Sequence, residues 1–212
     1  MSRTTLKPGA LLSPLPAVLV TCGSGRRSNV LTIAWTGIVN SAPPMTYISV
    51  RRERYSHALI AEGGEFVIHL VTEELAFAAD WCGVRSGRDV DKFAAMHLQT
   101  TASRVVACPT LTASPLALEC RVTETHTYPS HDMFVAEIVG VSVDEDLLDD
   151  KGRLRLDRAG LIAYNHGEYF PLRQRALGGF GYSVMKPKTR RKRAARRRAE
   201  HRRRHRPRSS GQ

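Results

Sequence analysis

The sequence predicts a mainly β protein, a mostly antiparallel β-barrel with small flanking helices. Many short segments are rich in β-branched and apolar residues, and turn-forming residues separate them. Only a few segments carry the spacing of a helix. The connections between segments are too short and too rarely helical for a doubly wound parallel sheet. Together these observations favour one antiparallel fold with little helix.

The first two strand-like segments form a hairpin signal. Ala17–Cys22 and Val30–Thr36 are both apolar, and the polar linker Gly23–Asn29 (GSGRRSN) joins them. A phosphate-binding loop is the alternative for this glycine-containing linker. The linker lacks the GxxxxGK[ST] pattern, however, and no clear helix follows it. We therefore expect a turn.

The later strands are predicted from apolar runs and from alternation. Leu116, Leu118, Cys120 and Val122 alternate with polar residues, as in a half-buried strand. By these criteria the predicted strands are Met45–Val50, Glu65–Val71, Pro115–His126, Met133–Val143, Leu161–Tyr164, Tyr169–Leu172 and Phe180–Met185.

The helical segments are short. Glu53–Glu62 has helical spacing, and the glycine pair that follows predicts its end. Thr72 can cap a second helix, because two glutamates favourable in a first turn come next. We expect a loop over Gly83–Val90 and a short helical turn over Asp91–Met96.

The positive charge is concentrated at the C-terminus. The chain has 212 residues and a net charge of +12, and 14 of its 32 Lys and Arg residues lie in 186–212. Residues 1–185 hold 18 basic and 19 acidic side chains. We expect a domain over 1–185 and a low-complexity tail over 186–212, disordered or transiently helical. Such a tail can contact polyanions, either nucleic acid or an acidic membrane surface.

The sequence indicates a cytoplasmic protein. No apolar run reaches the about 18 residues of a membrane span, and prolines interrupt the N-terminus, so we expect neither a transmembrane segment nor a signal peptide. The four cysteines lack CxxC spacing and are expected to be reduced. Cys82 differs from the others because it adjoins a glycine-containing segment. No His triad has metal-ligand spacing, and no metal is expected.

Two segments carry the chemistry of a phosphate-bearing cofactor. Arg51–His57 (RRERYSH) joins a predicted strand to a predicted helix, whose N-terminal amides favour phosphate. Arg54 and Ser56 can add bidentate and hydroxyl contacts. Cys82–Phe93 (CGVRSGRDVDKF) offers small residues and Lys92, a cation that can offset charge on a reduced flavin. The alternatives are a solvated arginine face and an ordinary surface loop.

Two further side chains have open interpretations. His131 precedes a strand and is either structural or chemical. Trp35 is either a core residue or a residue that flanks a flavin ring. No GxGxxG motif follows a strand, so NAD(P)H, if it is a substrate, must dock without a Rossmann unit.

An ordered series of motifs resembles the flavin reductase-like family, in particular its flavoredoxin-type members. The motifs run in the family's order through residues 12–185: NVLTIAW, SAPPMTYISVRRERYSH, EFVIHL, CGVRSGRDVDKF, LEC, SHDMFVAEIVGV and GGFGYSV. The resemblance implies an FMN-binding split β-barrel and a homodimer with flavin near the subunit interface. The arginine-rich tail is not part of the family pattern.

The resemblance also implies the roles of individual residues. Asn29 matches a structural turn position, and His131 matches a position on the nicotinamide or substrate side of the flavin. The implied cofactor-binding residues are Thr32, Ala34 and Trp35 along the ring, Val50 and Arg51 beyond them, Arg54, Tyr55 and Ser56 at the phosphate, and Cys82, Gly83, Ser86, Gly87 and Lys92 in the second segment. His131 and Lys92 are the expected catalytic residues.

Three functions follow as hypotheses. The first is an FMN-dependent oxidoreductase that passes electrons from NAD(P)H or a redox protein to flavin or another acceptor. The second is a flavin-binding protein without turnover. The third is a nucleic-acid-associated protein in which the basic tail dominates.

Overall fold

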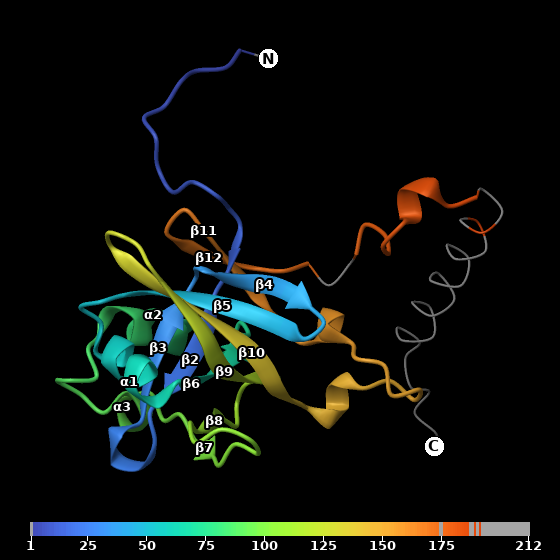
Figure 1. The fold of residues 1–212 in the computed structure, drawn as a ribbon. Helices are drawn as coiled ribbons and strands as arrows, with labels where there is room; N and C mark the ends of the chain where they lie inside the picture. The colour runs from blue at the N-terminus through green and yellow to red at the C-terminus, as the bar shows by residue number, and fades with distance from the viewer. Residues whose placement is uncertain (1, 174–175, 187–188, 190, 192–212) are drawn as a thin grey trace, which may run out of the picture. The chain divides into compact units, whose positions relative to one another are not determined.

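The computed structural model describes residues 2–173, 176–186, 189 and 191. The chain divides into two compact units, Met1–Gln174 and Arg175–Gln212. Most of the predicted tail over 186–212 lies outside the described residues. In the second unit, Tyr182–Val184 form a 3-10 helix. The other helices and strands that the structure describes belong to the first unit (Figure 1).

A seven-stranded antiparallel sheet forms the body of the first unit, in the order β3-β2-β6-β9-β10-β5-β4 (Figure 1). Its strands are β2 (Val18–Cys22), β3 (Asn29–Ile33), β4 (Thr36–Ser41), β5 (Pro44–Arg51), β6 (Glu65–Leu70), β9 (Leu116–Thr127) and β10 (His131–Val143). The two edge strands β3 and β4 are joined by Ala34–Trp35 alone. Because two residues cannot cross an open sheet of this width, the sheet must curl on itself.

The junction between the edges is open rather than fully paired. The Ser49 amide donates to the Trp35 carbonyl at 2.9 Å, which joins β5 to the linker between β3 and β4. The barrel is therefore split beside Ala34–Trp35. This confirms the predicted fold class.

Smaller elements cover the barrel. One minor sheet contains β1 (Leu15–Pro16), β11 (Ile162–Asn165) and β12 (Glu168–Pro171), and another contains β7 (Thr100–Thr101) and β8 (Thr110–Leu111). The helices are α1 (Tyr55–Gly63), α2 (Ala76–Val84) and α3 (Lys92–Ala95). Further 3-10 turns lie at Gly25–Arg27, Glu145–Leu147 and Leu156–Arg158.

Apolar side chains are buried on both faces of β2. Val18, Val20 and Cys22 belong to one core cluster, together with Phe66 and α1 residues. Leu19 belongs to a second cluster, which packs against α2. The sequence of a strand that is covered on both faces is a nearly continuous apolar run, as in AVLVTC. Full burial of each large apolar side chain contributes about 1.5–3 kcal/mol, so these two clusters fix the strands that carry the site.

Several predicted elements differ from the structure. The predicted strand Phe180–Met185 is wrong, because Gly181 has a left-handed φ of 75° and begins a 3-10 turn. The second helix begins at Ala76 rather than after Thr72, and it extends through Gly83 into the predicted loop. The predicted strand Val30–Thr36 is broken at Ala34–Trp35, and β4 continues beyond it. All four cysteines are free, as expected, and all four, Cys82 included, are buried.

Candidate functional site

One cavity of about 720 Å³ collects the predicted site residues. Its walls come from the end of β3 with Ala34–Trp35, from the turn between β5 and α1, and from the α2–α3 segment. The predicted residues that line it are Thr32, Ala34, Trp35, Val50, Arg51, Arg54, Tyr55, Ser56, Cys82, Gly83, Ser86, Gly87, Lys92 and His131. The fold therefore brings segments up to about 100 residues apart around one space of ligand size.

The N-terminus of α1 opens on this cavity. Arg54 is the N-cap residue, and no side chain caps the first turn. Helix N-terminal amides without a protein partner form a site for anions. The Arg54 guanidinium lies across the cavity wall, where it donates to the Gly83 carbonyl at 3.0 Å. This hydrogen bond ties the turn before α1 to the end of α2.

Ser56 is buried beneath this turn. Its hydroxyl oxygen accepts a hydrogen bond from Asn29 Nδ2 at 2.7 Å, and both residues are buried. The Ser56 hydroxyl keeps a proton that it can donate, and the Cys22 thiol lies within hydrogen-bond reach of the same side chain. Asn29, expected to be a structural turn residue, orients Ser56 from the first residue of β3.

Two arginines that were not predicted also line the cavity. Arg88 donates to the Glu53 carbonyl at 3.2 Å, and its guanidinium lies 5.9 Å from the centre of the Tyr55 ring. Arg85 lines the same space. Both lie within the segment that sequence analysis selected, and the basic pattern VRSGR was the available signal. With Arg51, Arg54 and Lys92, they outnumber the two carboxylates of the lining, Glu53 and Asp80, so the cavity carries a net positive charge.

Gly87 permits close contact between two walls. A Cβ atom at this position would lie 2.3 Å from Asn29 Oδ1 and 2.8 Å from Tyr55 Cδ1. Nothing larger than glycine fits there without displacing the Asn29 side chain. Gly83 is less restricted, since its Cβ would lie 3.3 Å from Thr32 Cβ.

Lys92 joins β3 to α2. Its ammonium donates to the Val30 carbonyl at 2.9 Å and to the Cys82 carbonyl at 2.7 Å, and the residue is 3% exposed. Burial lowers the pKa of Lys92, and the nearby Arg54 lowers it further. The cation lies in the cavity wall and holds two backbone segments, a structural role that sequence analysis did not predict.

His131 and Trp35 form another part of the wall. Their ring centres are 4.6 Å apart, and Ser130 Oγ lies 2.8 Å from His131 Nδ1. Burial, together with the charge of Arg51, lowers the pKa of His131. Trp35 is 41% exposed, so the interpretation as a core residue is wrong.

A tyrosine pair that was not predicted also lines the cavity. Tyr164 and Tyr169 face each other across β11 and β12, with ring centres 5.4 Å apart. The Tyr169 hydroxyl donates to the Asp80 carboxylate at 3.3 Å, and burial with the nearby Asp80 raises the pKa of Tyr169 to about 12. No local motif marks these residues, because only the packing of the minor sheet brings them to α2.

Cys82 also lines the cavity but is not activated. It is 1% exposed, and burial raises the pKa of its thiol to about 11. A reactive cysteine needs a lowered pKa and access. The geometry is that of a packing residue.

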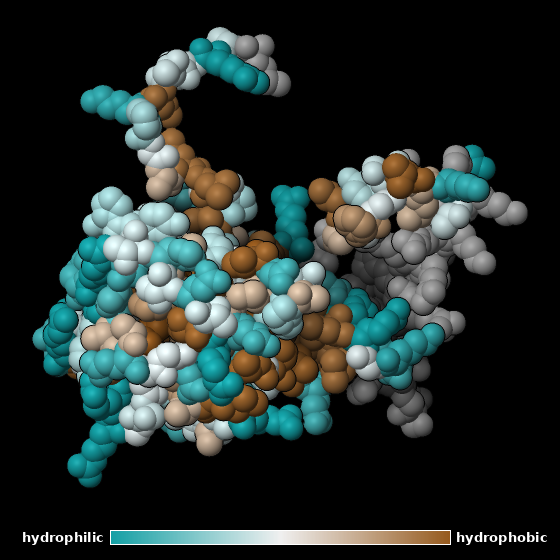
Figure 2. Space-filling model, viewed as in Figure 1, coloured by the Kyte–Doolittle hydropathy of each residue, from teal (hydrophilic) through white to brown (hydrophobic). Residues whose placement is uncertain are grey.

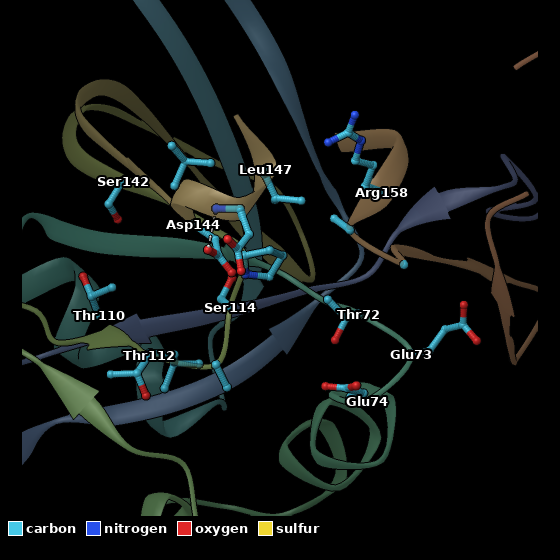
Figure 3. A pocket seen from close by; sticks show the side chains of 17 residues that line it. Thr72, Glu73, Glu74, Thr110, Thr112, Ser114, Ser142, Asp144, Leu147 and Arg158 are labelled. Atoms are coloured by element: carbon cyan, nitrogen blue, oxygen red, sulfur yellow. Dashed lines mark hydrogen bonds between the residues drawn. The ribbon is translucent and has the colours of Figure 1, made fainter. Parts of the chain in front are cut away.

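A larger cavity, of about 970 Å³, lies elsewhere and has the wrong charge for phosphate (Figure 3). Its polar lining includes Glu73, Glu74, Asp144 and Asp146, and among the described residues that line it only Arg158 is basic. Carboxylates in this number repel a phosphate dianion. The smaller, arginine-lined cavity is the better candidate.

Two features are absent from the described part of the chain. Within it, no group of three or more His, Cys, Asp and Glu side chains could hold a metal ion. No helix among the same residues has both the length and the apolar character needed to cross a membrane.

The part of the chain that forms the cavity matches a known protein family. A model of the flavin reductase like domain matches residues 11–173. The chain belongs to the flavin reductase-like family. These residues span every element of the cavity.

Solved structures agree with this family assignment. Flavoredoxin of Desulfovibrio vulgaris (Miyazaki F) is 28% identical, with a TM-score of 0.79 over 86% of this chain and 100% of that chain. Flavoredoxin from Methanosarcina acetivorans is 25% identical, with a TM-score of 0.79 over 87% and 100%. The FMN-binding protein from Thermus thermophilus is 26% identical, with a TM-score of 0.71 over 84% and 98%. These similarities support a flavin-related redox function.

Proposed function

We propose that the protein is an FMN-dependent oxidoreductase that passes electrons from NAD(P)H or a redox protein to flavin or another acceptor. The observation that carries this proposal is the arginine-lined cavity built from β3, the uncapped start of α1 and the α2–α3 segment. Its donor set fits FMN. Cations and free amides gather at one helix start for a phosphate dianion, and an open strand edge with an aromatic ring lies nearby for a flat ring system.

The residues have distinct proposed roles. Arg54, the first amides of α1 and the Ser56 hydroxyl bind the phosphate. Thr32, Ala34 and Trp35 hold the ring along the edge of β3, and Lys92 contributes positive charge from the wall. When bound, FMN would supply the redox chemistry between donor and acceptor, and these residues would hold and orient it.

His131 is proposed to hold a proton beside the ring system. Because its pKa lies below the ordinary value of 6.5, the imidazole is neutral at pH 7 and keeps a proton on one ring nitrogen. The contact with Ser130 Oγ at Nδ1 fixes the orientation of the ring. Trp35 covers one face of the imidazole and keeps water from it.

We also propose that the protein is a homodimer. Ile38 and Val39 on β4 and Val141 on β10 are large apolar residues exposed to solvent. Figure 2 shows apolar side chains gathered over the region of β4, β5 and β10. An exposed patch of this kind marks an interface. Sedimentation velocity of the full chain tests it, and a monomer at micromolar concentration would contradict it.

The decisive experiment is flavin binding by the purified full chain. FMN is titrated against wild type, Arg54→Ala and Arg121→Ala, with flavin fluorescence as the readout. Arg121 is the control because it is an exposed arginine of β9, paired with Glu65, and does not line the cavity. Loss of the Arg54 contact is expected to weaken FMN binding by about 1.5–3 kcal/mol, the scale of a charge-assisted hydrogen bond.

Two results would overturn the proposal. If wild type takes up no FMN, the cavity is not a flavin site. If FMN binds but neither NADH, NADPH nor a chemically reduced redox protein bleaches it anaerobically, the protein binds flavin without turnover. If Arg54→Ala and wild type bind FMN with equal affinity, only the assignment of Arg54 to the phosphate site is refuted.

A further inference from the structure

The turn proposed to bind phosphate is held from behind by one carboxylate. Arg52 and His57 flank residues 53–56, all of which line the cavity. Arg52 Nε donates to Asp132 Oδ1 at 3.0 Å, and His57 Nε2 lies 2.8 Å from Asp132 Oδ2. Among the described residues that line the cavity, Arg52, His57 and Asp132 are absent. The two ends of the turn are thus tied to the same side chain on its far side.

Asp132 is well placed to act as this anchor. It is the second residue of β10, where it pairs with Val50 of β5, and it is 8% exposed. Burial opposes ionisation of its carboxyl group, but the hydrogen bonds from His57 and Arg52 outweigh this effect and lower its pKa. The sheet therefore supplies a rigid, charged acceptor directly beside the point where β5 ends.

The partners of Asp132 are fixed as well. Arg52 also donates to the Tyr128 carbonyl, so its guanidinium bridges the turn before β10 and the carboxylate. The His57 ring packs against Phe134, with ring centres 5.3 Å apart. A ligand site on a loop gains affinity when the loop is ordered before binding. The contacts of Asp132 provide that order without touching the ligand.

We infer that Asp132, through Arg52 and His57, is a positioning residue that fixes the turn 53–56 for the phosphate of FMN. Its neighbour His131 lies in the cavity wall, so the first two residues of β10 serve the two ends of the site. This inference rests on the proposed function for the identity of the ligand. The ordering of the turn itself does not depend on it.

The test compares Asp132→Asn and Asp132→Ala with Asp149→Asn in the full chain. Asp149 is the control because its carboxylate also pairs with an arginine, Arg153, but lies outside the cavity. Affinities are measured for FMN and for riboflavin, which lacks the phosphate. Amide hydrogen exchange of residues 53–57 is measured without ligand, with β6 as the internal reference.

The Asp132 variants are expected to raise the Kd for FMN about five- to tenfold, the scale of ordering one or two loop side chains. The Kd for riboflavin and the exchange of β6 are expected to stay unchanged, while residues 53–57 exchange faster. A general structural defect would instead weaken the binding of both flavins and speed up amide hydrogen exchange in β6. Unchanged exchange over 53–57, or equal losses for both flavins, would overturn the inference.

The same data separate the two proposals. If wild type binds neither flavin, the proposed function fails and the phosphate assignment falls with it. Faster exchange over 53–57 in Asp132→Asn would then still support the anchor. Unchanged exchange would overturn the anchor whether or not FMN binds.

Discussion

Replacing Lys92 with methionine separates its structural role from its proposed electronic role. The ammonium donates to the carbonyls of Val30 and Cys82. Both carbonyls need a side-chain donor, because their positions leave them without a backbone partner. β3 is an edge strand, so half of its backbone groups point away from the sheet. Cys82 lies in the last turn of α2, where carbonyls lack helical partners. Lys92 satisfies one group of each kind.

The two hydrogen bonds of Lys92 determine how much stability Lys92→Met is expected to lose. Leaving a buried acceptor without a partner costs about 1–3 kcal/mol, and two acceptors are affected. Removal of a buried cation returns part of this cost, because the ammonium no longer has to be desolvated. We therefore expect Lys92→Met to lower the free energy of unfolding by about 2–4 kcal/mol. With an m-value of about 2 kcal/mol per molar urea, the midpoint falls by about 1–2 M.

Urea unfolding of the full chain without flavin, followed by circular dichroism, measures this loss. Lys151→Met is the control, because Lys151 is exposed and its side chain has no hydrogen-bond partner in the described residues. A change smaller than about 0.5 kcal/mol for Lys92→Met, within the range of ordinary surface substitutions, would refute the structural reasoning. Lys92 would then act through its charge alone.

Three further predictions concern His69, Cys82 and Gly87. Burial lowers the pKa of His69 to about 4, so between pH 6.5 and 4 the unfolded chain binds a proton that the folded chain does not. The free energy of unfolding should therefore decrease by about 3 kcal/mol as the pH is lowered through this window. The urea midpoint of His69→Gln should change less with pH than that of wild type. The Cys82 thiol, with a pKa of about 11, should react with a thiol reagent at pH 8 only on unfolding, and rapid labelling of the native chain would argue against its burial. Gly87→Ala should lower stability by about 1–3 kcal/mol and weaken FMN binding. Gly63→Ala is the control and should change neither stability nor FMN binding, because a Cβ atom there meets nothing within 4 Å. Equal thermal unfolding of the two variants would contradict the close approach of Gly87 to Asn29.

Local signals were sufficient for much of the fold. The hairpin of β2 and β3 follows from two apolar runs around a polar linker, and Gly64 ends α1 with a left-handed φ of 65°. Asp91 caps α3 by accepting from the Ala94 amide at 3.1 Å, as its sequence position suggests. In each case the information lies within a few residues of the element it determines.

Long-range closure accounts for what local signals missed. β4 is an exception, because it pairs with β5 in a local hairpin, and it was missed because most of its residues are exposed and give no strong strand pattern. Tyr164 and Tyr169 reach the cavity through a minor sheet that pairs with β1, about 150 residues earlier in the chain. Asp132 is marked by nothing in SHDMF as the partner of Arg52 and His57, since that contact arises from the register of β10 with β5.

The split in the barrel explains why the cavity lies where it does. The Val30 carbonyl faces away from β2, toward Lys92, so by the two-residue period of an antiparallel strand the backbone groups of Thr32 also face the open edge. Ala34 follows in the same phase as the chain leaves β3. In a closed barrel these groups would pair with a neighbouring strand. Here the edge at Thr32 and Ala34 borders a cavity whose lining includes four arginines. An edge that would otherwise recruit another strand is thus available to a planar ligand that bears both hydrogen-bonding groups and a phosphate.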